Sequence, residues 1–341
     1  MKRGVIMEQE SIIKHKCEQL LLRASHFDAS DLHLLPGEHQ YKIMFRKYGQ
    51  FIHAGELPSD IANRMISYFK FLSSLDISEK RKPQSGAFQK QLNDHFYSFR
   101  ISTLPSAFHK ESLAIRLLRQ NYTLPISTLC YDTKAATELC QLVTQSQGLL
   151  LISGATGSGK TTSLYSLVQY CSNELSRHVI SLEDPVESSQ EQLLQIQVNE
   201  RAGVTYATGL KAILRHSPDI IMVGEIRDKE TAKIAIEAAF TGHLVISSIH
   251  AKDTINCLYR LMDLDVSVEE MRQMLIAVVS QTLITTEQDE QKALFEILSE
   301  ATLETALNEI AHQRKYTLPY DQTLVGQRAK LGVKLYEPTS Y

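Results

Sequence analysis

The stretch Gly154-Ala-Thr-Gly-Ser-Gly159-Lys160-Thr161 separates an apolar run at 149–153 from a helical pattern at 161–173. It matches G-x-x-x-x-G-K-[ST] in the strand–loop–helix context in which that pattern binds phosphate. Glycines let successive backbone N–H groups point at phosphate oxygens, and the start of the helix adds partial positive charge. A glycine-rich turn without a ligand is the plainer alternative, and the flanking strand and helix argue against it. We therefore predict a nucleotide site.

The predicted ligands of this site are ATP and Mg²⁺. Lys160 is expected to reach the β- and γ-phosphates, and the Thr161 hydroxyl is expected to coordinate Mg²⁺. The residues expected to contact the nucleotide are Gly154, Ala155, Thr156, Gly157, Ser158, Gly159, Lys160, Thr161 and Thr162.

Around this loop, apolar strands alternate with helical stretches. The runs 149–153, 178–183, 219–223 and 244–249 are typical of strands buried on both faces, and helical patterns cover 161–173, 206–215 and 228–240. Such alternation predicts an α/β fold with a mostly parallel sheet covered by helices. After residue 265 the pattern predicts helix throughout, most clearly over 266–285.

The N-terminal part has a different pattern. A helix is predicted around residues 12–24 and another over 61–75, with strands at 31–35, 41–48, 51–53, 86–91 and 95–101. This predicts a small α+β domain over residues 1–120, followed by a linker at 121–130 that contains Pro125. The ATPase domain is expected at 131–265 and a C-terminal helical subdomain at 266–341.

Composition narrows the class of protein. The chain has 341 residues, 43% apolar and 22% charged, as expected of a globular protein of two domains. A net charge of −3 argues against a protein that binds nucleic-acid backbones.

Five scattered cysteines indicate thiols in a reducing compartment. No run approaches the ~20 apolar residues that cross a bilayer, and the leading segment lacks the apolar stretch of a signal peptide. We expect a cytoplasmic protein that reaches a membrane only through a partner.

Carboxylates follow two of the predicted strands. Ligands of an open α/β sheet bind outside the carboxyl ends of its strands. Glu183 and Glu187 follow the second strand, and Glu225 follows the strand that begins at Asp219. Because a strand rises about 3.3 Å per residue, Asp219 is expected ~15–20 Å from Glu225. Glu225 is therefore predicted to lie near Mg²⁺, and Asp219 to be an ordinary polar residue; solvated loop acids are the plainer alternative for the carboxylates.

Two histidines flank the strand at 244–249. His250, at its carboxyl end, is the candidate sensor of the γ-phosphate, and His243, at its amino end, is expected to be structural.

The ordered motifs resemble those of the secretion and type IV pilus ATPases, or traffic ATPases. Their order is a Walker A loop at 154–162, an aspartate box at 177–187, a Walker B segment at 217–225 and a histidine box at 241–250. The N-terminal segments 29–33, 99–105 and 114–118 are similar to that family's second N-terminal domain. Segments 69–86 and 197–206 resemble a subgroup, the competence ATPases of Gram-positive bacteria.

The resemblance implies a PAS-like N-terminal domain, a RecA-like P-loop core and roles for particular residues. Glu187 would be the general base with Glu183 beside it, and Thr161 and Glu225 would hold Mg²⁺. Arg100 and Arg116 would reach the nucleotide and stabilise the transition state; surface arginines are the plainer alternative. Less specific candidates for arginines that reach the nucleotide are Arg119, Arg201, Arg215 and Arg227.

Two departures from the family's pattern stand out. The tetracysteine zinc site of many relatives has no counterpart, because only Cys257 follows the histidine box, so no zinc is expected. Ala155 replaces the usual proline of the loop, which removes no ligand. The tail beyond about residue 286 matches the family poorly.

The resemblance implies Mg²⁺-dependent ATP hydrolysis by a homo-oligomer, expected to be a hexamer. It would act on a polytopic inner-membrane protein that assembles a competence pseudopilus for DNA uptake, or a related secretion or pilus machine. Neither membrane insertion nor direct nucleic-acid binding is expected. A pilus-retraction motor, a DNA translocase and a non-hydrolysing nucleotide-binding scaffold are the alternatives.

Overall fold

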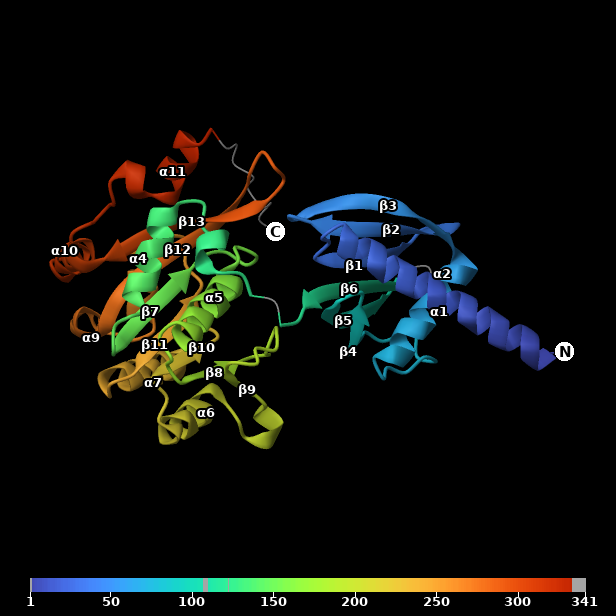
Figure 1. Ribbon diagram of the computed structural model, residues 1–341, viewed down its shortest axis with the longest axis horizontal. Helices are drawn as coiled ribbons and strands as arrows, with labels where there is room; N and C mark the ends of the chain where they lie inside the picture. The colour runs from blue at the N-terminus through green and yellow to red at the C-terminus, as the bar shows by residue number, and fades with distance from the viewer. Residues whose placement is uncertain (1, 107–109, 122, 333–341) are drawn as a thin grey trace. The chain divides into compact units, whose positions relative to one another are not determined.

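The chain consists of two compact units that divide between Tyr122 and Thr123 (Figure 1). The computed structural model describes residues 2–106, 110–121 and 123–332, and the side chains from Ile12 onward. Each unit is considered by itself. No helix in these described ranges is both long and apolar enough to span a bilayer.

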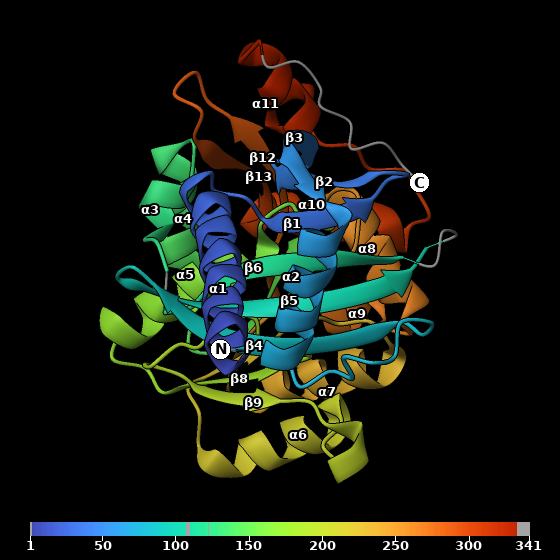
Figure 2. The same ribbon diagram turned by 90° about the vertical axis from the view of Figure 1, so that its right-hand side faces the viewer.

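The first unit is an antiparallel six-stranded sheet with two helices on one face. The strands lie in the order β3-β2-β1-β6-β5-β4. Figure 2 shows the helices α1 and α2 over one face of this sheet. The elements are α1 (Lys2–His26), β1 (Asp31–Pro36), β2 (Gln40–Lys47), β3 (Gln50–Pro58), α2 (Ser59–Leu72), β4 (Gln84–Leu92), β5 (His95–Pro105) and β6 (Glu111–Arg119).

Alternation of buried and exposed side chains explains why the helices cover a single face. Along β2, Tyr41, Ile43 and Phe45 are buried and the residues between them are more exposed. Their apolar face packs against Leu21 of α1 and Phe69 of α2. Strand β6 was not predicted, and it adds Ile115 to this core.

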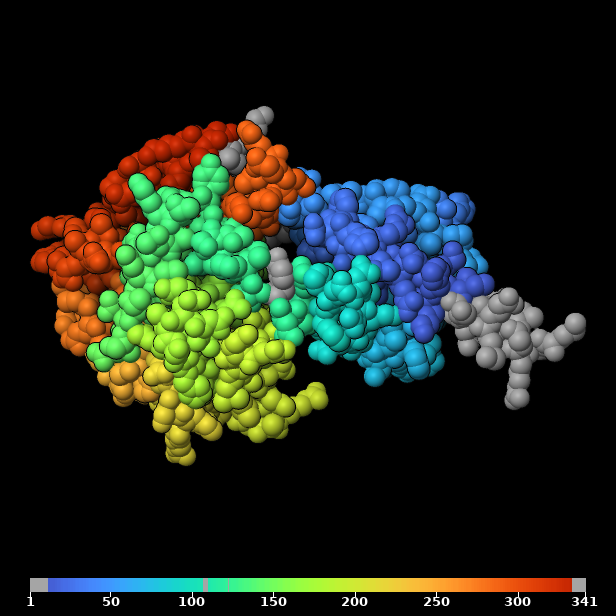
Figure 3. All heavy atoms as spheres, viewed as in Figure 1, coloured from blue at the N-terminus to red at the C-terminus, as the bar shows by residue number. Residues whose placement is uncertain are grey.

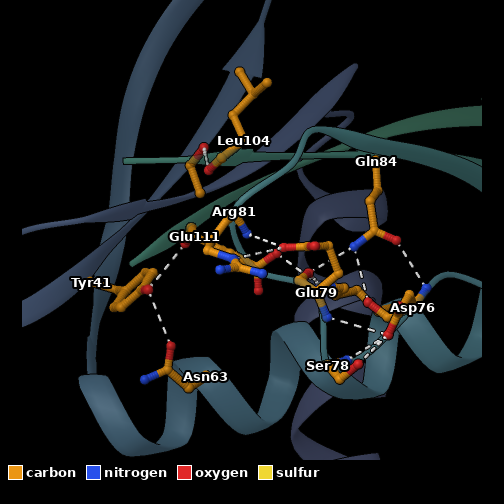
Figure 4. A network of polar contacts seen from close by, with 11 residues as sticks. Tyr41, Asn63, Asp76, Ser78, Glu79, Arg81, Gln84, Leu104 and Glu111 are labelled. Atoms are coloured by element: carbon orange, nitrogen blue, oxygen red, sulfur yellow. Dashed lines mark hydrogen bonds and ion pairs between the residues drawn. The ribbon is translucent and has the colours of Figure 1, made fainter. Parts of the chain in front are cut away.

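A buried ion pair joins α2 to β6. Lys70 Nζ donates to Glu111 Oε1 at 2.8 Å and to the Glu79 carbonyl at 2.7 Å. The Tyr41 hydroxyl donates to the Glu111 carbonyl at 3.0 Å, and the Gln84 amide donates to the Glu79 carbonyl (Figure 4). A buried charge is tolerated when it is paired and hydrogen-bonded, and here the pairing also fixes the segment between α2 and β4.

The second unit is built on a seven-stranded sheet of order β13-β12-β7-β11-β10-β8-β9. All neighbouring pairs are parallel except β12 and β13. The strands are β7 (Gly148–Ser153), β8 (Val179–Glu183), β9 (Leu194–Gln197), β10 (Ile220–Val223), β11 (Leu244–Ile249), β12 (Leu275–Thr285) and β13 (Gln291–Ser299).

Helices cover both faces of this sheet. On one face α3 (Ile126–Leu129), α4 (Thr133–Leu142) and α5 (Lys160–Asn173) enclose one apolar cluster. The other face is covered by α6 (Tyr206–Ile213), α7 (Lys229–Phe240), α8 (Thr254–Asp263), α9 (Val268–Met274) and α10 (Glu300–Ala311), and α11 (Leu324–Lys330) follows in the chain. Successive residues such as Leu150 and Leu151 enter opposite clusters, which is why the central strands are apolar throughout.

The prediction of helix throughout residues 266–341 is wrong for β12 and β13. Both strands belong to the central sheet, and β12 lies between β7 and β13. The run Leu275–Thr285 is apolar on both faces, and a short run of this kind has no period that separates a strand from a buried helix. Helices α9, α10 and α11 do occur in this region, and the part of the predicted tail from 333 to 341 lies outside the described residues.

Candidate nucleotide site

The loop between β7 and α5 has the conformation that its glycines allow. Gly154 and Gly159 have φ of +149° and +85°, in the region that favours glycine. A Cβ atom at Gly154 would lie 2.6 Å from the Gln281 carbonyl oxygen, so a side chain there would collide with β12. The two ends of the loop therefore require glycine, one of them for space as well as for backbone angle.

Lys160 begins α5 and folds back over the loop. Its Nζ donates to the Gly154 carbonyl at 2.8 Å and to the Ala155 carbonyl at 3.0 Å. Burial lowers the pKa of Lys160, and the carboxylate of Glu225 opposes that shift. The ammonium group is thus held at the loop with an acidic side chain near enough to act on it.

Glu225 is the centre of a charged cluster at the carboxyl edge of the sheet. Its side chain is 15% exposed, and Oε1 lies 2.8 Å from His250 Nε2. Its other oxygen, Oε2, accepts a hydrogen bond of 2.8 Å from Arg227 Nε, and this contact raises the pKa of Arg227. Strands β10 and β11 are parallel neighbours, which is why the residues that follow them meet. Arg227, one of the less specific candidates for an arginine that reaches the nucleotide, therefore hydrogen-bonds to a predicted magnesium ligand.

The two carboxylates predicted side by side have different environments. Glu183 is 3% exposed and accepts hydrogen bonds from the Tyr165 hydroxyl, from Ser181 Oγ at 2.7 Å and from Gln195 Nε2 at 3.1 Å. Burial and Glu183 together raise the pKa of Tyr165. Glu187 lies four residues further along, in an exposed position. Glu183 is therefore buried and hydrogen-bonded, and Glu187 is exposed to water.

Asp219 and His243 lie at the opposite, amino edge, as predicted. Asp219 Oδ2 accepts from the His178 backbone N–H at 2.7 Å. The carbonyl of His243 accepts from the Gly148 backbone N–H at 3.1 Å. Both residues contact the main chain near the start of a strand. The loop follows the other end of β7, so a strand's length separates it from both residues.

The candidate arginines of the first unit share one row across its sheet. Arg100 on β5 is directly opposite Arg116 on β6, and Arg116 is opposite Asp31 on β1. Arg116 Nε is 3.0 Å from Asp31 Oδ1. Arg46 on β2, which belongs to none of the motifs, is the residue opposite Asp31 on the other side.

The remaining less specific candidates are scattered. Arg119 donates to the ring of His95. Arg201 and Arg215 are exposed in the second unit, at the short helical turns Glu200–Ala202 and Leu214–His216.

Two residues near the loop were missed. Gln281 of β12 donates from Nε2 to the Ser158 carbonyl at 2.8 Å, and Tyr165 of α5 binds Glu183. The available signal for Gln281 is a polar residue inside the largely apolar run 275–285, but the predicted helix over this run does not place it beside the loop.

A groove elsewhere in the second unit contains none of the predicted site residues. It has a volume of about 780 Å³ and is lined by residues of α4, β13, α10 and α11, among them Lys134, Phe295 and Lys330. In Figure 3 the green surface of α4 borders the red surface of this C-terminal region. The predicted nucleotide site is therefore separate from this groove.

The described residues include no group of three or more histidine, cysteine, aspartate or glutamate side chains placed to hold a metal ion. The expectation of no zinc stays a prediction. For Mg²⁺, the residues present are a hydroxyl, Thr161, and a carboxylate, Glu225, which acts electrostatically on Lys160. Oxygen donors of these kinds suit Mg²⁺, which keeps waters and takes few protein ligands when phosphates supply the rest.

Comparisons with known proteins identify the family of this chain. Residues 7–320 match the family described as Type II/IV secretion system protein. The competence protein ComGA of Bacillus subtilis is 45% identical over 276 residues, covering 81% of this chain and 76% of that protein. The type II secretion system protein E of Pseudomonas aeruginosa is 37% identical over 282 residues, covering 82% of this chain and 56% of that protein.

Solved structures of ATPases share the fold. The ATPase DotB of Legionella pneumophila superimposes with a TM-score of 0.74 at 22% identity, covering 93% of this chain and 92% of that one. The pilus retraction motor PilT, with bound ADP, gives 0.67 at 24% identity, covering 94% and 95%. This likeness confirms the predicted fold class, a RecA-like α/β core preceded by a small α+β domain.

Proposed function

Because the chain belongs to the type II/IV secretion system protein family, the traffic ATPases, we propose that it hydrolyses ATP to ADP and phosphate with Mg²⁺. One observation carries the proposal: Lys160 is held at a phosphate-binding loop, and the cluster of Glu225, His250 and Arg227 lies at the same edge of the sheet.

The residues around the loop fit an ATP–magnesium complex. The positive φ angles at Gly154, Gly157 and Gly159 are backbone conformations in which successive N–H groups can turn toward phosphate oxygens. Lys160 would exchange its loop carbonyls for phosphate oxygens. Thr161 and Glu225 would hold Mg²⁺, which neutralises phosphate charge when bound.

The proton of the attacking water would pass to a carboxylate of the loop after β8. Glu187 suits this role because it is exposed and an ionised carboxylate can accept a proton. Glu183 would help to position the loop that carries Glu187. Its carboxylate is fixed by hydrogen bonds from Tyr165, Ser181 and Gln195. His250, bound to Glu225, would respond to the γ-phosphate.

The N-terminal unit would supply Arg100 and Arg116 to the nucleotide of its own chain or of a neighbour. An arginine at the transferred phosphoryl group neutralises the charge that develops there. Their position on one row of one sheet means that both would arrive together.

The same proposal includes an assembly and a pathway. The chain would act as a hexamer in the cytoplasm, at the inner face of the cell membrane, bound to a polytopic membrane protein that assembles a pseudopilus for DNA uptake. The 45% identity to a competence protein supports this pathway over other secretion or pilus machines. Direct contact with nucleic acid or insertion into the membrane is not part of the proposal.

The activity is tested by phosphate release from the purified full chain with Mg²⁺, with EDTA and with added DNA. Hydrolysis that needs Mg²⁺ and does not respond to DNA is expected; DNA-stimulated turnover would favour a translocase. Native mass spectrometry tests the hexamer. For the pathway, loss of DNA uptake in the host on deletion of the gene, restored by wild type, is the expected result, and unchanged uptake would contradict it.

A further inference from the structure

Strand β12 runs past the end of β7 and lies beside the phosphate-binding loop. Ser280 pairs with Ser153, the last residue of β7, so Gln281 is the first residue of β12 beyond that strand. On its other side Gln281 pairs with Phe295 of β13. Gln281 is therefore held by its pairing with β13 on one side and lies next to the loop on the other, on a strand where backbone position is well defined.

Gln281 contacts both ends of the loop. Its backbone carbonyl oxygen lies 2.6 Å from the position of a Cβ atom on Gly154, and its side-chain Nε2 lies 2.9 Å from that of a Cβ atom on Gly159. Nε2 donates to the Ser158 carbonyl at 2.8 Å, and the residue is 3% exposed. One residue of β12 thus limits where the loop can begin and where it can end.

The hydrogen bond has a direct consequence for phosphate binding. In a planar trans peptide the C=O and the next N–H point in opposite directions. With the Ser158 carbonyl directed at Gln281, the Gly159 N–H is directed away from β12. Rotation of this peptide would turn a carbonyl oxygen, which repels phosphate, toward the side where an N–H group is needed.

The orientation of the Gln281 amide is itself determined. Exchange of its oxygen and nitrogen would place Oε1 against the Ser158 carbonyl oxygen, with no hydrogen between them. In the part of the chain that the structure describes, Gln281 Oε1 is buried without a hydrogen-bond partner. The bond to Ser158 is then the polar contact that favours one orientation of the amide over the other.

We propose that Gln281 is a positioning residue that holds the Ser158–Gly159 peptide of the loop in its phosphate-binding orientation. The inference rests on the proposed binding of ATP. Gln281 does not touch the nucleotide; it acts through the loop backbone.

The test compares Gln281→Met with Thr282→Val, a matched control one residue along the same strand. Methionine has nearly the shape of glutamine without the donor. Thr282 is opposite Leu294 of β13, and its side chain projects to the other face of the strand from that of Gln281. Calorimetry with Mg·ATP, Mg·ADP and adenosine gives affinities, and the Tm of the nucleotide-free protein reports stability. Gln281→Met is expected to weaken ATP and ADP binding about three- to tenfold, as for one lost neutral hydrogen bond, and to leave adenosine binding unchanged.

A purely structural role predicts a different result: a lower Tm with unchanged ratios of ATP to adenosine affinity. Wild-type ATP affinity in Gln281→Met, with a wild type that binds ATP, would overturn the positioning role alone. Failure of the wild type to bind ATP would remove the proposed function as well. If Gln281→Met does not fold, Gln281→Asn decides, because its amide is one methylene too short to reach Ser158, and the same loss of ATP affinity is expected.

Discussion

The two edges of the parallel sheet carry polar residues with different partners. At the carboxyl edge, Glu225 contacts the side chains of His250 and Arg227. At the amino edge, Asp219 accepts from the backbone N–H of His178. A ligand can rearrange side chains that bind one another beside the phosphate-binding loop. An aspartate that accepts from a backbone N–H near the start of a neighbouring strand, away from the loop, serves the fold. Substitutions at the carboxyl edge should therefore change turnover, and those at the amino edge should change stability.

The largest effect is expected for Lys160→Ala. The loop loses the ammonium group that Lys160 holds at its carbonyls, and phosphate charge loses its partner. Phosphate release should fall to background, measured with purified protein. Near-normal phosphate release would show that the nucleotide site is not at the carboxyl edge. The proposed functional difference between the two edges would then be wrong.

A second prediction tests whether turnover also needs residues of the first unit, by the substitutions Arg100→Ala and Arg116→Ala. Each is expected to lower turnover about 10³-fold or more, the range of arginines that neutralise a transferred phosphoryl group. ATP affinity and native mass should stay near wild type. Arg46→Ala, on the same row of the sheet, is the matched control and should keep wild-type turnover. Wild-type rates for Arg100→Ala and Arg116→Ala would make both arginines surface residues, and loss of the oligomer would make them interface residues.

Glu187→Gln separates the two carboxylates that follow β8. The amide cannot take a proton from water, so turnover should fall about 10²- to 10⁴-fold while ATP binding is kept. Binding by calorimetry and single-turnover phosphate release measure the two effects. Normal turnover would move the role of base to Glu183 or another group, and loss of ATP binding would make Glu187 structural.

The smallest effect is expected at the amino edge. Asp219→Ala removes the acceptor of the His178 N–H and should lower the free energy of unfolding by about 1 kcal/mol, with unchanged kcat. Denaturant unfolding and steady-state phosphate release measure these quantities, with Asp219→Asn as a control that keeps an acceptor oxygen. A large loss of turnover in Asp219→Ala at wild-type stability would break the distinction between the edges.

The sequence by itself determined the parts that depend on short spacing. The loop at Gly154–Lys160 is a contiguous motif, and the rule that ligands bind at carboxyl strand ends placed Glu225 and His250 on the same edge, where they are in contact. Asp219 and His243 were assigned to the other edge by strand length alone. These inferences succeeded because each uses only neighbours along the chain or a repeated element.

Only the tertiary structure decided which distant segments complete the site. Strands β12 and β13 could not be told from helix, because burial on both faces removes the alternation that identifies a strand. With β12 misassigned, Gln281 had no place beside Ser158, more than a hundred residues earlier in the chain. The tertiary structure also decided that Glu183 is buried and Glu187 exposed. The side chains that donate to Glu183, Tyr165 and Gln195, come from other elements of the fold. Contacts between segments far apart in sequence depend on sheet order, and no local pattern records that order.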